Sequence, residues 1–179
     1  TANQSMNLTR ITDPAEAAIK HYADSLAILS WAEREGIKGA KILDVGTGAG
    51  FPAVPIALMR PEWRVTALDG TRKKAEFVGQ VAAKLGLINL KAEHGHSDHW
   101  VTGEKFDVVT TRAVASLARC MRTCHRFIKK SGRLIAYKTA TLTNEEICEA
   151  QQACGELGME MEQSFLYELE LNGEEMARA

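Results

Sequence analysis

The chain has 179 residues, of which 45% are hydrophobic and 25% are charged, a composition that is typical of one globular domain. No apolar run approaches the roughly 20 residues that a membrane-spanning helix requires, and no basic and apolar leader opens the chain, so we expect neither a membrane span nor a secretion signal. The cysteines at positions 120, 124, 148 and 154 lack the spacing of a disulfide framework, which favours the reducing cytoplasm.

The net charge of −1 conceals an asymmetry along the chain. Residues 1–140 contain 21 Lys and Arg against 13 Asp and Glu, a difference of +8, whereas residues 141–179 contain one Arg against ten Glu, a difference of −9. A body of this charge can attract a polyanion, while an acidic tail is often only solvated surface. Charge alone therefore does not decide the partner.

The first predicted element is a helix in an N-terminal helical segment, residues 1–38. The run Asp13-Pro14-Ala15-Glu16 places Asp at the N-cap, Pro at the first helical position and Glu at the capping-box position. The helix should continue to about Glu35 and end at Gly36.

Strands and helices alternate through residues 39–140. The expected strands are 41–45, 64–69, 90–94, 106–111 and 133–138, and the expected helices are 52–61, 71–85 and 116–130. This alternation predicts right-handed βαβ units in a three-layer, Rossmann-like α/β fold, with a mostly parallel sheet of order 3-2-1-4-5 and helices on both faces. In the acidic part, residues 141–179, we expect a helix over 144–157 and a strand over 161–169, all within the same single domain.

The strongest local signal is the run from Ile42 to Pro52, I-L-D-V-G-T-G-A-G-F-P. A glycine-rich turn between a strand and a helix is where doubly wound folds build a nucleotide site, because glycine permits a sharp turn and lets a ligand approach the backbone. Position 51 is Phe where the dinucleotide motif G-x-G-x-x-G requires Gly, which disfavours NAD. No G-K-[ST] follows, which excludes a P-loop.

Two acids flank this turn. Asp44 ends the first strand, where a negative charge would repel the pyrophosphate of a dinucleotide. Asp69 ends the second strand, where a carboxylate can accept hydrogen bonds from both hydroxyls of an adenosine ribose. The pair fits S-adenosylmethionine, which is cationic and carries no phosphate.

The chain also resembles, over nearly its whole length, the glucose-inhibited division protein B family, the ribosomal RNA small-subunit methyltransferase G family. The resemblance rests on Met6-Asn7-Leu8-Thr9, on His21 with Asp24-Ser25, on the run from Asp44 to Pro52, on Thr111-Arg112-Ala113-Val114-Ala115-Ser116-Leu117, and on Ala136-Tyr137-Lys138. Ala53, Gly70 and Thr139 depart from the residues usual in the family. The family has further helices before Asn7 and a seventh strand, so we expect terminal segments to be missing from this sequence.

The resemblance implies a class I S-adenosylmethionine-dependent methyltransferase that modifies N7 of a guanine in 16S ribosomal RNA, free or within the small ribosomal subunit, and releases S-adenosylhomocysteine. It also implies a cytoplasmic monomer without a metal. Taken with the glycine turn, it predicts a set of cofactor-binding residues. These are Asp44, Gly46, Thr47, Gly48, Gly50, Phe51, Asp69, Gly70, Thr71, Ser97, Asp98 and Arg112.

The substrate side is less marked in the sequence. Arg112 and Lys138 end the fourth and fifth predicted strands, at the rim where open α/β sheets bind ligands, and we expect them to orient substrate. Arg72-Lys73-Lys74 follows the cofactor acid and is a candidate contact for RNA phosphates. Guanine N7 carries a lone pair and no proton, so no general base is expected and no acid–base residue is predicted.

Other signals admit different interpretations. The run from His94 to His99, H-x-H-x-D-H, is typical of zinc hydrolases, but His125 is the only later histidine that could complete the site. A third hypothesis is an adenosine-binding module without catalysis. Four basic residues at helical spacing form either a solvated face or an RNA contact. These are Arg119, Arg122, Arg126 and Lys129. On that helix Cys124 should be buried, and His21 should be a hydrogen-bonding residue of the first helix.

Overall fold

The central sheet has the predicted order. The computed structural model describes residues 11, 13–112, 115–138, 142–162, 167–171 and 174–178. Its five parallel strands are arranged β3-β2-β1-β4-β5. They are β1 (Lys41–Val45), β2 (Arg64–Asp69), β3 (Leu90–His94), β4 (Phe106–Arg112) and β5 (Ile128–Tyr137). Met6 to Thr9, Ala113, Val114 and Thr139 lie outside the described residues.

The N-terminal helix consists of three consecutive parts, α2 (Pro14–Ala17), a π-helical turn η1 (Ala18–Ala23) and α3 (Asp24–Arg34). Asp13 caps it as predicted, since its carboxylate accepts a hydrogen bond from the Glu16 amide at 2.8 Å. The π turn has no signal in the sequence, and such turns are frequent at functional sites. Among the helices that the structure describes, none combines the length and the apolar character needed to cross a membrane.

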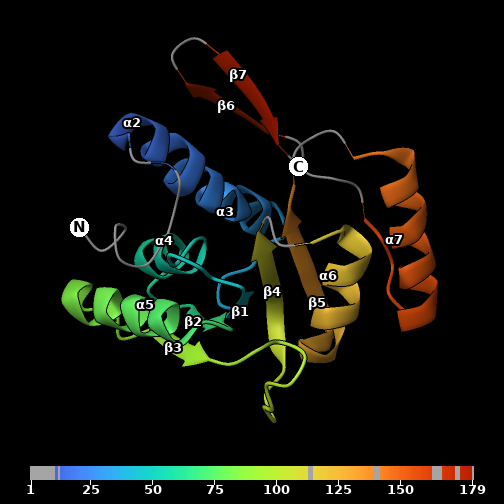
Figure 1. Cartoon of the computed structure of the whole chain (residues 1–179), viewed down its shortest axis with the longest axis horizontal. Coiled ribbons are helices and arrows are strands. Elements are labelled where there is room, and N and C mark those ends of the chain that lie inside the picture. The colour runs from blue at the N-terminus through green and yellow to red at the C-terminus, as the bar shows by residue number, and fades with distance from the viewer. Residues whose placement is uncertain are drawn as a thin grey trace.

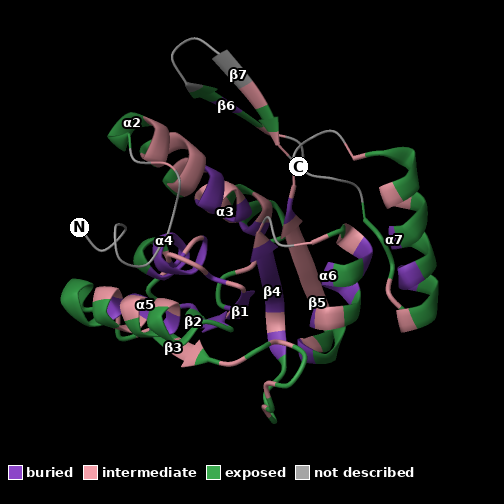
Figure 2. Cartoon of the chain, viewed as in Figure 1, coloured by how far each residue is buried: buried purple, intermediate pink, exposed green. Residues whose placement is uncertain are grey.

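Alternate residues of each strand enter two separate cores, one on each face of the sheet. Ile42 packs with the N-terminal helix, α4 (Ala53–Met59) and α5 (Arg72–Leu85), whereas Leu43 packs on the side of α6 (Leu117–Cys124). Both of these side chains are fully buried, as expected for a strand covered on both faces. A further helix, α7 (Asn144–Leu157), packs against α6. The predicted three-layer α/β fold is therefore confirmed (Figures 1 and 2).

The predicted helix over 116–130 is wrong at its end. Helix α6 ends at Cys124, a 3-10 turn η2 covers His125–Phe127, and β5 begins at Ile128. Phe127 is 2% exposed in the core beside β4, and Ile128 pairs with Phe106. Burial of Phe127 and strand pairing of the partly buried Ile128 outweigh the helical periodicity, which tertiary contacts often override.

Consequently the four basic residues from this segment do not share one helix face. Lys129 lies on β5 and pairs with Asp107 at 2.7 Å, and Arg122 on α6 pairs with Glu156 of α7 at 2.8 Å. Of the two other members, Arg119 lies on α6 and Arg126 lies in the 3-10 turn η2.

The predicted strand over 161–169 is confirmed only at its end, over 167–169, and residues 161 and 162 are not in a strand. Residues 163–166 lie outside the described part, and the next element is a two-stranded antiparallel sheet of β6 (Tyr167–Leu171) and β7 (Glu174–Arg178). It lies beside the N-terminal helix rather than at the edge of the central sheet (Figure 1). The Tyr167 hydroxyl donates a hydrogen bond to Asp24 at 2.8 Å, a contact between residues 143 positions apart.

Gly132 tests the packing of β4 against β5. A Cβ atom there would lie 2.8 Å from Cγ2 of Ile128 and 2.9 Å from the carbonyl oxygens of Phe106 and Asp107. Because two of these atoms belong to the backbone, Gly132→Ala should lower the free energy of unfolding by about 1–3 kcal/mol. Gly155→Ala, in open space on α7, should instead stabilise by up to about 1 kcal/mol. Urea unfolding of both variants measures this, and equal effects would contradict the packing.

Candidate cofactor site

The glycine turn after β1 is held directly against β2. The amides of Gly46 and Thr47 both donate to the carbonyl oxygen of Leu68, at 2.8 and 3.0 Å. Gly46, Gly48 and Gly50 have φ of +76°, +59° and +96°, the left-handed region that favours glycine.

The later two glycines of the turn face different surroundings. A Cβ on Gly50 would meet Val54 of α4 at 2.7 Å, so this glycine allows the helix to pack against the turn. A Cβ on Gly48 would meet only the Gly46 carbonyl oxygen, at 3.9 Å. Gly48 therefore leaves open space on the cavity side of the turn.

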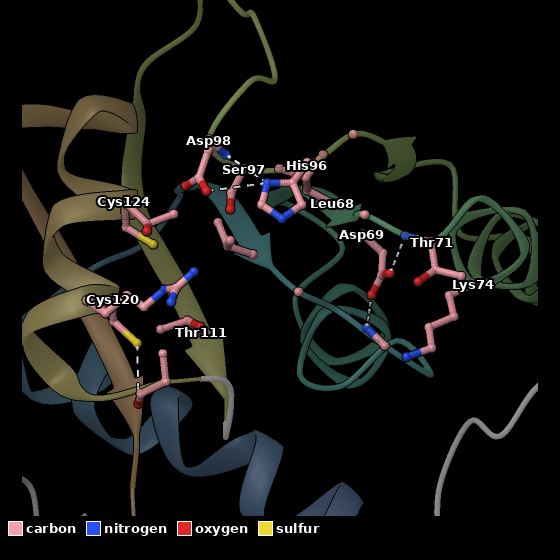
Figure 3. Close-up of a pocket in the computed structure, with 18 residues that line it drawn as sticks. Leu68, Asp69, Thr71, Lys74, His96, Ser97, Asp98, Thr111, Cys120 and Cys124 are labelled. Atoms are coloured by element: carbon pink, nitrogen blue, oxygen red, sulfur yellow. Dashed lines mark hydrogen bonds and ion pairs between the residues drawn. The ribbon is translucent and has the colours of Figure 1, made fainter.

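A cavity of about 350 Å³ lies at the carboxyl ends of the strands, between α5 and α6. Its volume is within the usual range for small-molecule sites, about 300–1,000 Å³. Seven of the predicted cofactor residues line it (Figure 3). They are Gly46, Gly48, Asp69, Gly70, Thr71, Ser97 and Asp98. The structure thus brings together residues from the turn, from the end of β2 and from the loop after β3.

Asp69 connects the two turns that border this cavity. Its Oδ2 accepts a hydrogen bond from the Gly48 amide and its Oδ1 accepts one from the Thr71 amide, both at 2.8 Å (Figure 3). The side chain is 7% exposed. A carboxylate has about four acceptor positions, so these two contacts leave capacity for two ligand hydroxyls.

Asp44 lies below the glycine turn and does not line the cavity. It is 1% exposed; Oδ1 accepts a hydrogen bond from the Thr110 hydroxyl at 3.0 Å, and Oδ2 has no partner among the described residues. Burial raises the pKa of this carboxyl from 3.8 to about 6, and the hydroxyls of Thr47 and Thr110, followed by the positive charge of Arg112, offset that rise only in part. An incompletely paired buried acid is costly, which is typical of a functional position.

Phe51 and Arg112 are outside the cavity lining, in contact with the N-terminal helix. The Phe51 ring stacks on His21 at 4.8 Å and meets the edge of Tyr22 at 5.0 Å. The Arg112 guanidinium lies 5.6 Å from the Phe51 ring centre. Thr47 and Gly50 are likewise absent from the lining. Five of the predicted cofactor residues, Asp44 included, therefore surround the cavity rather than form its surface.

Arg112 is bound by three groups of the N-terminal helix. It donates to the Lys20 carbonyl at 3.1 Å and to Asp24 at 3.2 Å, and it lies 3.1 Å from Nδ1 of His21. The prediction that His21 is a hydrogen-bonding residue is confirmed. Desolvation, followed by the charge of Arg112, lowers the pKa of His21. Three contacts occupy three of the five N–H donors of a guanidinium and leave two for other groups.

Lys138 holds the end of β5 against the two helices beside it. Its Nζ donates to the Ala115 carbonyl and to Glu146 of α7, each at 2.7 Å. The same Glu146 oxygen accepts from the Leu117 amide at 3.0 Å, at the start of α6. The hydrogen bond from Lys138 lowers the pKa of Glu146. In this conformation the ammonium group of Lys138 is engaged in contacts that join β5, α6 and α7.

The cavity also has lining residues that the sequence did not indicate. These are Val45, Leu68, Lys74, Gly95, His96, Thr111, Ala115, Arg119, Cys120, Thr123 and Cys124. Lys74 was predicted as an RNA contact only, and its neighbours Arg72 and Lys73 are exposed outside the lining.

Cys124 shows why the sequence pattern did not predict all residues that line the cavity. It is buried as predicted, 1% exposed, and burial raises its pKa to about 12. An apolar helix face predicts burial, but the same face here also borders the cavity. Arg119 is exposed at the mouth, where its helical spacing gave no sign of a cavity.

The histidine-rich loop does not assemble a metal centre in the part of the chain that the structure describes. No three His, Cys, Asp or Glu side chains there come close enough to hold a metal ion. His96 instead lies 3.5 Å from Asp98 and 5.9 Å, ring to ring, from His99.

The fold and the cavity together define a class of protein. A parallel sheet of this order, with a glycine turn after β1 and an acid at the end of β2, is that of class I S-adenosylmethionine-dependent methyltransferases. Solved structures share the fold. A SAM-dependent methyltransferase from Aquifex aeolicus is 17% identical, with a TM-score of 0.64 and coverage of 96% of this chain and 94% of that one. A ribosomal protein L11 methylase from Lactobacillus delbrueckii is 19% identical, with a TM-score of 0.58 and coverage of 86% and 76%.

Sequence comparison gives the family. The model of the family described as rRNA small subunit methyltransferase G matches residues 1–171. Two relatives named ribosomal RNA small subunit methyltransferase G come from Solibacter usitatus, 38% identical over 93% of this chain and 77% of the relative, and from Clostridium perfringens, 36% identical over 97% and 72%. The chain belongs to this family. It is a methyltransferase, and its methyl donor is S-adenosylmethionine.

Gly48 tests the open side of the turn. Gly48→Ala directs a methyl group into the cavity, so binding of S-adenosylhomocysteine should weaken by about fivefold to 150-fold, corresponding to roughly 1–3 kcal/mol of steric cost. Gly158→Ala is the matched control, because Gly158 has nearly the same φ, +63°, and nothing within 4 Å of its Cβ position. Titration calorimetry should show normal affinity for the control. Equal affinity in both variants would contradict the assignment.

Asp44 predicts a pH dependence of stability. Because its pKa is raised from 3.8 to about 6, the folded protein holds this proton more tightly than the unfolded chain. The stability that this proton contributes is fully present below about pH 4, falls as the pH rises through about 6 and is absent above about pH 7; it amounts to about 3 kcal/mol at 1.36 kcal/mol per unit. Asp44→Asn lacks the carboxyl, so its stability relative to wild type should rise by up to that amount between about pH 4 and about pH 7.5. Urea unfolding that gives a constant difference would refute this.

Proposed function

We propose that the chain transfers the methyl group of S-adenosylmethionine to N7 of a guanine in 16S ribosomal RNA, as a cytoplasmic monomer. The observation that supports this most is the cavity itself, in which the residues of the glycine turn, Asp69 and the loop after β3 face one space. The free state of all four cysteines agrees with a reducing compartment. The relatives are named for small-subunit ribosomal RNA, which gives the class of RNA.

The lining fits the proposed donor. Asp69 retains acceptor positions for the two ribose hydroxyls, Ser97 and Asp98 offer polar groups to the adenine, and the open side of Gly48 gives room next to the turn. Asp44 lies just below that turn with one unpaired oxygen, and its negative charge favours a cationic ligand. These features suit an adenosine joined to a positively charged amino-acid portion.

Methyl transfer from S-adenosylmethionine to guanine N7 requires no general acid or general base. S-adenosylmethionine, when bound, supplies a methyl group on a sulfonium, an electrophile that needs no activation by protonation. Guanine N7 has a lone pair and no proton to remove. The residues of the chain therefore act by positioning the two reactants in line, which can supply roughly 7–11 kcal/mol of the barrier.

The substrate side of the proposal rests on cations around the cavity. Lys74 and Arg119 line it from α5 and α6, and Arg72 and Lys73 are exposed on the first turn of α5. Arg112 keeps two donors beyond its contacts with the N-terminal helix. An A-form helix hides N7 in its deep groove, so the target guanine must be unpaired, distorted or presented within the subunit.

Lys138 needs a rearrangement to touch substrate. Its Nζ is already within 2.7 Å of Ala115 and Glu146, so its proposed part in orienting substrate is to fix the end of β5 beside Arg112.

The substrate assignment is tested by loss and restoration of one modified base. Ribosomal RNA from cells that lack the protein should lack one 7-methylguanine in the small subunit, and the purified protein with S-adenosylmethionine should restore it, as read by mass spectrometry of nuclease digests. Methylation of proteins or small molecules alone would defeat the RNA assignment while leaving the cofactor assignment intact.

The basic cluster predicts the salt dependence of this activity. The rate should fall between about 50 and about 200 mM salt, because phosphate contacts release counterions. Alanine at Arg72, Lys73 and Lys74 should flatten the plot of log affinity against log salt by roughly 0.7 for each phosphate contact that the change removes. A matched triple change at the amino-end edge of the sheet should leave the slope unchanged. Its positions are Lys38, Lys84 and Lys130, all exposed.

A further inference from the structure

The loop between β3 and β4, residues 95–105, forms one wall of the cavity and carries Ser97 and Asp98. It contains no helix or strand. A single turn orders its first part, in which the amides of His99 and Trp100 donate to the His96 carbonyl at 2.9 and 2.7 Å. Contacts outside the loop must therefore fix its position relative to the cavity.

Arg126, in the 3-10 turn after α6, supplies such contacts at both ends of the loop. Its guanidinium donates to the carbonyl oxygens of Ser97 and of Trp100, the latter at 2.9 Å. Its own carbonyl oxygen accepts a hydrogen bond from Nζ of Lys105. Hydrogen bonds from a charged donor are about twice as strong as neutral ones.

The guanidinium is itself supported by the core. It lies 4.6 Å from the ring centre of Phe127, which is 2% exposed. The Trp100 ring packs against the same Phe127 ring at 5.6 Å. Trp100 also folds over Gly95, where a Cβ would lie 2.6 Å from its Cδ1 atom. Arg126 and Trp100 thus fasten the loop to one rigid aromatic group.

We propose that Arg126 is a positioning residue that sets the adenine end of the cofactor cavity, by holding the loop so that Ser97 and Asp98 face the ligand. This proposal rests on the proposed function, in which Ser97 and Asp98 contact the adenine. Arg126 does not line the cavity and acts only through the loop. A purine with an amino group at position 6 can donate to Asp98 from that position, whereas one with an oxygen there presents an acceptor at the same place.

Arg122 provides the matched control. It is also an exposed arginine of the same segment, but its guanidinium hydrogen-bonds and pairs with Glu156 of α7, whereas that of Arg126 donates to Ser97 and Trp100. Removing either arginine deletes the same charge and the same number of atoms. Only the loss of Arg126 should therefore change the cavity.

The experiment compares two ligands that differ at the 6-position of the purine, S-adenosylhomocysteine and S-inosylhomocysteine. Arg126→Ala should bind the adenine ligand about three- to tenfold more weakly, the loss expected when one ordinary hydrogen bond to the ligand is misplaced, and should discriminate less between the two ligands. Hydrogen exchange over residues 96–105 should become faster. Arg122→Ala should behave as wild type in both measurements, and Arg126→Lys, which keeps one donor, should recover part of the affinity.

Unchanged affinity, discrimination and exchange in Arg126→Ala would overturn the proposal even though the wild type binds the adenine ligand. Failure of the wild type to bind S-adenosylhomocysteine would overturn the proposed function and this inference with it. If Arg126→Ala unfolds, hydrogen exchange rises throughout the chain. The proposal is then tested by hydrogen exchange in two milder variants, Arg126→Lys and Lys105→Ala. Faster exchange confined to the loop in Lys105→Ala supports the role of Arg126 in holding the loop, and unaltered exchange in both variants refutes it.

Discussion

The two turns that border the cavity are joined through one carboxylate. Asp69 ends β2 and accepts a backbone hydrogen bond from the turn after β1, through Gly48, and another from its own turn, through Thr71. Charge-assisted bonds of this kind are strong when they are shielded from water. The same carboxylate faces the cavity, so the group that fixes the shape of the site is also the group available to the ribose. Shape and recognition are therefore coupled at this residue.

On the other side of the turn, the N-terminal helix meets the carboxyl end of β4 through a cluster of polar groups. Asp24 is 6% exposed and contacts Arg112, the Tyr167 hydroxyl and, at 3.6 Å, Arg178. A buried charge pair is costly to form and more costly to break, which favours one arrangement of the helix, of β4 and of the C-terminal hairpin. The π-helical turn brings the Lys20 carbonyl to the same arginine. This arrangement holds Arg112 near the cavity without using all of its donors.

A methyl transfer to an unprotonated nitrogen places the demand on geometry, because no proton has to move. In this structure, hydrogen bonds between elements fix the walls of the cavity, and no titrating group is needed for the transfer. The glycine turn is bonded to β2, the loop after β3 is bonded to Arg126, and Lys138 joins the ends of β5, α6 and α7. Each attachment comes from a different element, so the cavity depends on the whole sheet being formed.

The sequence by itself determined the order of the sheet and the location of the turn. Alternating apolar segments with glycine breaks specify βαβ units, and the positive φ of the turn can be met readily only by residues such as Gly46 and Gly48. Both are local properties. For the same reason the N-cap at Asp13 and the burial of Cys124 were predicted correctly.

Only the tertiary structure decided where α6 ends, that a separate hairpin comes after α7, and which residues share the cavity. Phe127 and Ile128 leave the helix because β4 offers them a core and a partner strand, and no local pattern records that competition. Arg122 and Arg126 look alike in the sequence, yet one meets Glu156 and the other meets the loop after β3. The positions of such long side chains depend on contacts between segments far apart in the chain, which helical spacing cannot encode.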